Sequence, residues 1–352
     1  MEYSPKVYIL IVNWNGWADT IECLESVFKC DYPHYQVIVC DNDSQNNSIE
    51  HIKAWADGSL NVYVHPSNSL RQLSFPPVPK PIEYVEYDRA QAERGGLQGV
   101  NKASLIIVKI GANLGFAGAN NVGLRYVLAK KDCRYVWLLN NDTVIASDAL
   151  ITLVHRMKKR PEAGICGATL LHYNKPDTIQ TLGGARYNRW FATTHLIGNH
   201  QNKTVPIDTA AVESKISYVD GSSMFISMEF LLKIGLLNED YFLYFEEIDW
   251  SVRAQNIIGH TYSQSSIVYH KGGASTGSCY SSHTRTALAD YYIIRNRIKF
   301  TKRYYPLFLP IVYIGQIGVI FNRIARRQWK MALTTFGIII TSIINYSENS
   351  AD

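Results

Sequence analysis

The sequence lacks the patterns that mark several other classes of protein. Its six cysteines form no CxxC pair and no spacing typical of a metal site, which indicates reduced thiols in a reducing compartment. The net charge of +5 is too small to indicate nucleic acid as a partner. The first residues show no basic segment followed by a signal-type apolar stretch, so we expect a cytoplasmic protein.

Prolines are scarce in most segments but concentrated in one. Five prolines fall between residues 66 and 81, and three glycines follow between residues 95 and 99. Proline fixes φ and lacks an N–H group, so it excludes a regular helix here. We predict that residues 65–104 form an inserted surface loop within a first domain that covers residues 1–280.

Unbroken apolar runs alternate with segments of helical periodicity. The runs show no alternation of polar and apolar residues, which predicts strands buried on both faces of a parallel sheet. Asp19, with Glu22 three residues later, is the expected N-cap of the first helix. The pattern predicts an α/β fold of right-handed βαβ units, with an irregular polar region at 172–217. The strands are expected at residues 7–12, 37–40, 105–110, 135–139 and 164–171, and further helices at 48–55, 148–156 and 229–234.

The run at 135–139 ends in Asn140, Asn141 and Asp142. Ligands of open α/β sheets bind at the carboxyl ends of the strands. A carboxylate beside two amides suits a hard divalent cation, which prefers oxygen ligands. A polar turn that merely closes the strand is the competing interpretation, because Asn and Asp also favour turns.

A glycine-rich segment lies between the strand at 105–110 and a predicted helix. Its glycines follow a G-x3-G-x2-G spacing over Gly111, Gly115 and Gly118. Glycines at this place let backbone N–H groups approach a phosphate at a helix N-terminus. A dinucleotide-binding loop is the rival interpretation, but it requires G-x-G-x-x-G after the first strand.

Three acids follow a run of aromatic residues at 241–250. A helix that begins near Glu246 would place Glu246 and Asp249 on one face and direct Glu247 elsewhere. Acids in a first turn also complement the helix dipole, which is a purely structural role. A neighbouring aromatic wall would instead raise the pKa of one carboxyl toward that of a general base. His270, at the polar end of another strand, is a further candidate.

The last seventy residues differ in character from the rest. We predict a helix at 290–303, followed by apolar segments at 311–321 and 331–344 that basic residues flank. Each apolar segment is shorter than the roughly 20 residues of a membrane-spanning helix. We therefore expect residues 281–352 to form helices that lie in a membrane interface. Helices packed on the first domain are the alternative.

The ordered set of motifs resembles family 2 glycosyltransferases, and most closely their rhamnosyltransferase-like branch. The resemblance spans residues 7 to about 300. It implies a GT-A fold, a mostly parallel sheet flanked by helices, with the C-terminal helices as an extension. The motifs that carry it are NWNG (13–16), CDNDS (40–44), NLGFAGANN (113–121), LLNNDT (138–143), DGSSMFI (220–226), YFLYFEEIDW (241–250) and YHKGGAST (269–276).

The resemblance implies a site that binds a nucleoside-diphosphate sugar. Asn141 and Asp142 occupy the place of the family's Asp-x-Asp motif, with Asp142 as the metal ligand. Glu247 falls on the general base, and His270 on an additional metal or phosphate contact. The implied base, ribose, diphosphate and sugar contacts are Asn13, Asn15, Asp41, Asn113, Gly115, Asn120 and Gly221.

Two positions depart from the family pattern. Only one carboxylate remains in the Asp-x-Asp position, and the base is Glu247 in place of an aspartate, so Glu246 and Asp249 stay open as alternatives. The implied activity is an inverting sugar transfer that uses Mg²⁺ or Mn²⁺, with rhamnose as the favoured sugar. The implied donor is a dTDP- or UDP-sugar and the acceptor is a glycan or lipid-linked hydroxyl in cell-surface polysaccharide synthesis, at the inner face of the plasma membrane.

Two other functions remain open at this point. A non-catalytic member would bind nucleotide sugars without turnover. A dinucleotide-dependent oxidoreductase would use the glycine-rich segment for a nicotinamide cofactor.

Overall fold

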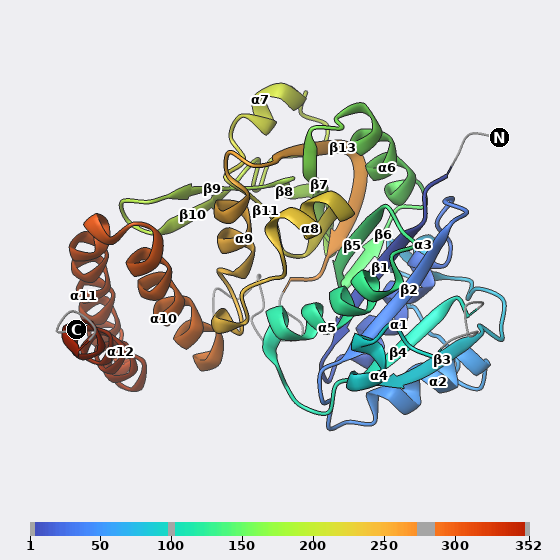
Figure 1. The fold of residues 1–352 in the computed structure, drawn as a ribbon, viewed down its shortest axis with the longest axis horizontal. Helices are drawn as coiled ribbons and strands as arrows, with labels where there is room; N and C mark the ends of the chain where they lie inside the picture. Colours follow the sequence, from blue (N-terminus) through green and yellow to red (C-terminus); the bar gives the residue numbers. More distant parts are fainter. Residues whose placement is uncertain (1–3, 98–102, 273–285, 349–352) are drawn as a thin grey trace.

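A computed structural model describes residues 4–97, 103–272 and 286–348. Its main sheet has the strand order β3-β4-β2-β1-β5-β12-β7-β13-β6, with β8 paired to β7, and helices lie on both of its faces (Figure 1). The strands of this sheet are β1 (Val7–Asn13), β2 (Tyr35–Asp41), β3 (Tyr84–Asp88), β4 (Leu105–Lys109), β5 (Tyr135–Asn140), β6 (Thr143–Ile145), β7 (Ala163–His172), β8 (Lys175–Leu182), β12 (Ser223–Ser227) and β13 (Gly259–His270).

A smaller sheet of order β10-β9-β11 lies beside it. Its strands are β9 (Gly184–Asn188), β10 (Thr193–Leu196) and β11 (Tyr218–Val219). The helices are α1 (Trp17–Val27), α2 (Ser48–Asp57), α3 (Arg71–Ser74), α4 (Arg89–Glu93), α5 (Gly115–Lys130), α6 (Ala149–Lys159), α7 (Thr209–Glu213), α8 (Met228–Ile234), η1 (Glu239–Tyr241), α9 (Glu246–Ala254), α10 (Ala287–Tyr304), η2 (Pro306–Phe308), α11 (Leu309–Ala325) and α12 (Trp329–Glu348).

The main sheet separates two hydrophobic cores. Successive residues of β1 point to opposite faces, so Ile9 packs with helices α1, α2 and α6, whereas Leu10 packs with α5 and α8. Both side chains are fully buried. Burial on both faces explains why the strand sequences are uniformly apolar, as predicted.

The predicted α/β fold is confirmed, and the sheet is mostly parallel. Strands β3, β4, β2, β1 and β5 run parallel to their neighbours. On the other side of β5, β12 is antiparallel both to β5 and to β7. Strand β5 therefore lies in the middle of the sheet, and its carboxyl end opens between β1 and β12.

The prediction of an irregular loop at 65–104 is partly wrong. The prolines do lie in irregular backbone, but the chain after them forms strand β3, which pairs in parallel with β4 at the edge of the main sheet. Helices α3 and α4 also fall in this segment. The prolines end at Pro81, so the backbone N–H groups that follow are available for strand pairing.

The prediction of an irregular region at 172–217 is also wrong. It contains β8, β9, β10 and α7. These are short strands with exposed polar faces, so their sequences lack the uniform apolar character of the buried strands. Close packing of backbone on backbone holds them together: a Cβ on Gly184 would lie 2.0 Å from the carbonyl oxygen of Tyr218 in β11.

Helix α1 begins at Trp17 and not at Asp19 as predicted. Its N-cap is Gly16, whose carbonyl accepts a hydrogen bond from the N–H of Thr20, and no side chain caps it. The carboxylate of Asp19 instead pairs with the buried ammonium group of Lys271 at 2.5 Å. This ion pair ties the first turn of α1 to the end of β13.

The C-terminal helix α10 packs directly on the loop that precedes α9. Phe300 of α10 is fully buried against Tyr241 and Phe245. The side-chain amide of Asn296 lies 2.7, 2.8 and 2.9 Å from the carbonyl oxygens of Tyr241, Leu243 and Tyr244. Helix α10 therefore fixes the backbone conformation of this loop.

Helices α11 and α12 pack on each other and on α10, at one end of the molecule (Figure 1). The prediction that both apolar segments are too short to span a membrane is wrong for the first. Together η2 and α11 form a helix over Pro306–Ala325, whose 20 residues are long and apolar enough to cross a bilayer. The predicted 311–321 segment omitted the turns on either side that continue this helix.

We predict that Asn296→Ala lowers the free energy of unfolding by about 1–3 kcal/mol, because it leaves buried carbonyl oxygens without a donor. Urea denaturation of the purified protein measures this change. The control is Asn322→Ala, the same substitution at an exposed position of α11, which should change stability by less than about 0.5 kcal/mol. Equal effects of the two substitutions would contradict the anchoring role of Asn296.

Candidate active site

A cavity of about 660 Å³ opens where β1 and β5 end and β12 begins. The segment before α9, the end of β13 and the start of α5 complete its wall. Eight of the residues predicted from sequence line it: Asn113, Gly115, Asn141, Asp142, Gly221, Glu246, Glu247 and His270. The fold thus brings together side chains that lie up to 157 residues apart in the sequence, from Asn113 to His270.

Asn13 and Asp41 belong to a buried hydrogen-bond network behind this cavity. The side-chain amide of Asn13 donates to the carboxylate of Asp41 at 2.7 Å, and its oxygen accepts from Thr20 at 2.8 Å. Thr20 also accepts from the amide of Asn141 at 3.1 Å. Buried polar side chains need such partners. This network holds the ends of β1, β2 and β5 in register.

Asn15 lies apart from this buried network. It is exposed, and its side-chain oxygen accepts a hydrogen bond from the N–H of Gln45 at 2.7 Å. It therefore links the turn after β1 to the turn after β2. Asn13, Asn15 and Asp41 are not among the residues that line the cavity.

Asp142 and His270 face each other across the ends of β5 and β13. The His270 Nε2 atom lies 3.2 Å from a carboxylate oxygen of Asp142, and its Nδ1 atom lies 3.1 Å from the side-chain oxygen of Gln180. Burial opposes a charge on the imidazole, but the Asp142 carboxylate outweighs it and raises the pKa of His270. The imidazole is thereby oriented and polarised toward the carboxylate.

The donor set fits a divalent cation that shares its ligands with a substrate. Within the described ranges no group of three or more His, Cys, Asp or Glu residues is arranged so that it could hold a metal ion by itself. Asp142 and His270 supply one carboxylate oxygen and one imidazole nitrogen, both buried and aimed at the cavity. Mg²⁺ and Mn²⁺ accept such a sparse set, because phosphate oxygens and water complete their coordination.

The glycine-rich segment lines the cavity and also packs against the segment before α9. Gly115 has φ of +70°, and a Cβ there would lie 2.2 Å from the carbonyl oxygen of Phe242. The N–H of Phe116 donates to that same oxygen at 2.7 Å. The start of α5 therefore lies against the segment before α9. Gly115 permits this close approach because it has no side chain.

Two asparagines of this segment differ in their placement. Asn113 lines the cavity and accepts from the side-chain amide of Asn42 at 2.9 Å. Asn120 is buried inside α5, where it donates to the carbonyl of Phe116 at 2.9 Å, and does not line the cavity. The geometry thus favours Asn113 over Asn120 as a ligand contact.

Glu246 and Glu247 are adjacent buried carboxyls at the start of α9. Both line the cavity, which corrects the expectation that Glu247 points away from it. Burial raises the pKa of Glu246 to about 7. Burial, and then the charge of Glu246, raise the pKa of Glu247 well above 4.5. Two adjacent carboxyls in such a setting do not readily ionise together, so near neutral pH one of them is ionised while the other keeps its proton.

Asp249 serves the structure of this region. It is fully buried outside the cavity, where it accepts from Arg253 at 2.7 Å and from the hydroxyl of Tyr304 at 2.6 Å. Asp249, which the sequence leaves open as an alternative base, therefore does not line the cavity. Its charge is already neutralised by Arg253 within α9, and Tyr304 joins it to α10.

The backbone just before Glu246 adopts an unusual conformation. Phe242, Tyr244 and Phe245 have φ of +61°, +67° and +78°. Bulky side chains rarely occupy this left-handed region, and functional sites are where such conformations gather. The bonds from Asn296 hold these residues in place and so determine where the two glutamates point.

The sequence motifs contained further cavity residues that the prediction omitted. Asp220 is one, and its charge raises the pKa of both Glu247 and His270. It lies in the DGSSMFI motif, where an acid before a glycine at the start of a strand indicates a candidate site residue. Gln180 and Phe242 had no such signal, because their position depends on β8 and on the α10 contact.

The motif at the end of β13 is only partly described. His270, Lys271 and Gly272 are described, whereas residues 273–276 of the YHKGGAST motif lie outside the described residues. Gly272 and Thr286 both line the cavity.

Comparison with known proteins agrees with this geometry. The model of the family "Glycosyl transferase family 2" matches residues 8–72 and 91–217, more than half of the chain. A dTDP-rhamnosyl transferase, RfbF of Shigella flexneri, is 23% identical over 219 residues, which are 61% of this chain and 69% of that protein. The hexosyltransferase Agl10 of Haloferax volcanii, which acts in low-salt glycan biosynthesis, is 29% identical over 147 residues. That match covers 41% of this chain and less than half of Agl10.

Solved structures share the fold at low sequence identity. The mannosyltransferase PcManGT of Pyrobaculum calidifontis, in complex with GDP-mannose and Mn²⁺, superposes with a TM-score of 0.51 at 13% identity, over 97% of this chain and 88% of that one. GalNAc-T7 with UDP, GalNAc and Mn²⁺ gives 0.56 at 13% identity, over 89% and 50%. From the family match and the shared fold we conclude that this chain belongs to glycosyl transferase family 2.

Proposed function

We propose that this protein is an inverting glycosyltransferase that moves a sugar from a nucleoside-diphosphate sugar to an acceptor hydroxyl. The observation that carries the proposal is one cavity lined both by the buried pair Asp142 and His270 and by the carboxyls of the buried Glu246 and the half-buried Glu247. The first pair suits a cation and a diphosphate. The second suits a proton acceptor.

In this mechanism Glu247 takes the proton of the acceptor hydroxyl as that oxygen attacks the anomeric carbon. Its elevated pKa favours the proton transfer, because burial makes the carboxylate a stronger base. Glu246 carries a proton near neutral pH and so limits the negative charge beside Glu247. Gly221 adds no side chain, and a Cβ there would lie 3.9 Å from the Glu247 Cγ, so the acceptor can approach the base from that side.

The opposite wall of the cavity receives the leaving group. A Mg²⁺ or Mn²⁺ ion held by Asp142 and His270 would neutralise the charge of the departing nucleoside diphosphate. Asn113 and Asn141 offer side-chain amides that orient polar groups of the donor. Asn13, Asn15, Asp41 and Asn120, to which the resemblance assigns base, ribose and diphosphate contacts, do not line the cavity.

The similar proteins guide the choice of donor and acceptor. Rhamnosyltransferases from Shigella flexneri and Escherichia coli are among those that this chain resembles, so we propose dTDP-rhamnose as the donor. A UDP-sugar is the next candidate. The acceptor is a hydroxyl of a glycan or lipid-linked saccharide, in the synthesis of a cell-surface polysaccharide.

Two alternatives make different predictions. A non-catalytic member would bind the nucleotide sugar in the same cavity without turnover. A dinucleotide-dependent oxidoreductase would bind a nicotinamide cofactor, and its G-x-G-x-x-G spacing differs from the G-x3-G-x2-G spacing of this chain.

The exposed apolar surface of the C-terminal helices supports a location at the inner face of the plasma membrane. Leu307, Ile314 and Leu333 are 88%, 69% and 71% exposed, and Phe321 and Phe336 are also mostly exposed. Arg326, Arg327 and Lys330 follow α11. Exposed apolar side chains beside basic residues are typical of helices at the surface of anionic membranes.

Replacing the proposed base tests the mechanism. We expect Glu247→Gln to lower kcat by roughly 10²–10⁴-fold while nucleotide-sugar binding is kept, because the amide preserves shape but accepts no proton. Release of dTDP from dTDP-rhamnose, with and without a lipid-linked saccharide extract, provides the rate. The control is Glu229→Gln on α8, an exposed residue that pairs with Lys233. Unchanged turnover in the Glu247 variant would refute the assignment.

The protonation of Glu246 predicts a pH dependence of stability. Its pKa is higher in the folded state than the ordinary value of 4.5, so the free energy of unfolding should fall as pH rises from about 4.5 to about 7. Glu246→Gln should remove part of this fall. From pH 5 to pH 8 the free energy of unfolding of the variant should therefore rise by on the order of 2 kcal/mol relative to that of the wild type. Urea denaturation at both pH values, with Glu229→Gln as control, measures it. A wild-type stability that rises over this range in step with the variant would contradict the protonated state.

Membrane contact predicts flotation with lipid. The protein should float with phosphatidylglycerol vesicles in a density gradient and should float less with phosphatidylcholine. Phe321→Gln together with Phe336→Gln should reduce the bound fraction by about tenfold or more, because each Phe contributes buried apolar area. Tyr63→Gln, at an aromatic residue that is 74% exposed on the first half of the chain, is the control. Equal flotation of all three proteins would argue against this surface.

A further inference from the structure

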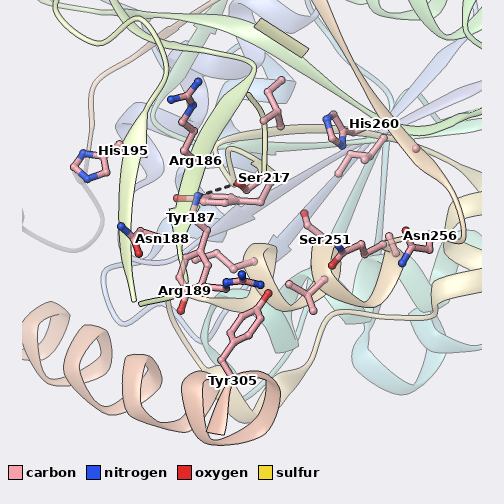
Figure 2. A pocket seen from close by; sticks show the side chains of 18 of the residues that line it. Arg186, Tyr187, Asn188, Arg189, His195, Ser217, Ser251, Asn256, His260 and Tyr305 are labelled. Carbon is pink, nitrogen blue, oxygen red and sulfur yellow. Dashed lines mark hydrogen bonds between the residues drawn. The ribbon is translucent and has the colours of Figure 1, made fainter. Parts of the chain in front are cut away.

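A second groove, of about 860 Å³, lies between the β9–β10 hairpin, helix α9 and Tyr305 (Figure 2). It shares no lining residue with the active-site cavity, but the two are built on the same elements. In β10, His195 lines the groove and Leu196 lines the cavity. In α9, Glu247 lines the cavity and Ile248 the groove. The groove is therefore a direct neighbour of the proposed base.

The groove is cationic. Arg186 and Arg189 line it together with His195 and His260, and within the described part of the chain it has no Asp or Glu in its lining. Neither arginine forms an ion pair with a carboxylate among the described residues. A guanidinium recognises carboxylate or phosphate through paired hydrogen bonds. The groove therefore offers two positive charges to an anion.

The position of Arg186 supports the interpretation that the groove binds an anion. Arg186 and His195 are direct cross-strand partners in the β9–β10 hairpin. Two groups that can both be positive cost stability when they lie opposite each other in a sheet. An anion held between them would remove that cost. Figure 2 shows both side chains on the hairpin, with His260 farther along the groove wall.

The rest of the lining suits a polar ring compound. Asn188, Ser251 and Asn256 present amide and hydroxyl groups (Figure 2). Trp190 is 51% exposed, so part of its ring is open to solvent, and Tyr305 lies near Arg189. Hydrogen-bonding groups beside partly exposed aromatic rings offer both a polar and an apolar contact to one ligand. Sugar rings have both kinds of surface.

We propose that this groove binds an anionic saccharide, a part of the acceptor that carries phosphate or carboxylate groups and lies away from the reacting hydroxyl. The inference rests on the proposed glycosyltransferase function. Helix α9 connects the two sites, and Gln255, at its end, lies about 12 Å along the helix axis from Glu247. An extended acceptor can therefore occupy the groove while one of its hydroxyls reaches the base.

Binding is tested by isothermal titration of the full chain at 0.15 M salt. The anionic probes are tetragalacturonate, which carries carboxylates, and maltotetraose 1-phosphate, and the neutral probe is maltotetraose. We expect at least one anionic probe to bind about tenfold or more tightly than maltotetraose, because charge-assisted bonds to arginine exceed neutral ones. Substitution of both arginines, Arg186→Gln and Arg189→Gln, should remove this preference.

The matched control removes the same charge elsewhere. Arg94→Gln with Lys175→Gln changes two exposed residues that do not line the groove, and should leave the preference intact. The proposal would be overturned if neither anionic probe bound at millimolar concentration. It would also be overturned if both double variants lost the preference for the anionic probe equally. If inorganic phosphate bound as tightly as the anionic saccharides, the groove would bind the anion alone, and the assignment to a saccharide would be wrong. Loss of phosphatidylglycerol vesicle binding in the arginine variant, without saccharide binding in the wild type, would identify a lipid headgroup instead.

The same preparation separates this inference from the proposed function. Stabilisation by dTDP-rhamnose is measured on the wild type and on the arginine double variant, whose changes lie outside the active-site cavity. Nucleotide-sugar binding without saccharide binding would overturn the groove assignment alone. Saccharide binding that depends on the two arginines, in a protein that binds no nucleotide sugar, would keep the groove and overturn the proposed function.

Discussion

The meeting of polar strand ends at one edge of a buried parallel sheet is the constraint on which this structure depends. Strand β5 lies between β1 and β12 with apolar residues on both faces, so it can end only where its polar residues find partners. Asn141 finds Thr20, and Asp142 finds His270 on β13. The same contacts that satisfy these buried groups assemble one wall of the active site.

The other wall depends on a contact from far along the chain. Glu246 and Glu247 follow three residues with positive φ, a conformation that the local sequence does not favour. Helix α10 stabilises it, through the amide of Asn296 and the buried ring of Phe300. The C-terminal helices therefore contact the segment before α9 directly. A membrane bound to these helices would be linked through α10 to the segment that positions the proposed base.

Much of the fold was predictable, since burial on two faces leaves a clear sequence signal. The uniform apolar runs predicted β1, β2, β4 and β5, and their polar ends predicted the position of Asp142. Strands β8 to β10 have no such signal, because they are partly exposed and their sequences mix polar with apolar residues. Motif resemblance located Glu247 and His270 in the cavity. The partners that orient them, Gln180 and Asn296, come from segments with no local signal.

Helical spacing alone gave the wrong orientation of the acids. It grouped Glu246 with Asp249, but the strained turn before α9 directs both Glu246 and Glu247 into the cavity. Asp249 instead satisfies Arg253 and Tyr304, and Tyr304 belongs to a helix 55 residues away in sequence. This error arises from tertiary contacts that a local pattern does not contain. The contact of Gly115 with the carbonyl of Phe242 likewise has no signal in the local sequence.

The proposed function requires that one cavity binds a nucleoside diphosphate and a divalent cation together. Thermal unfolding in the presence of dTDP, UDP, GDP, NAD⁺ or NADP⁺, each with and without Mn²⁺, measures this binding. We expect dTDP or UDP to raise Tm by roughly 3 °C or more at a hundredfold excess over Kd, and Mn²⁺ to increase this shift. A shift produced only by nicotinamide cofactors, or no response to any nucleotide, would refute the proposed function.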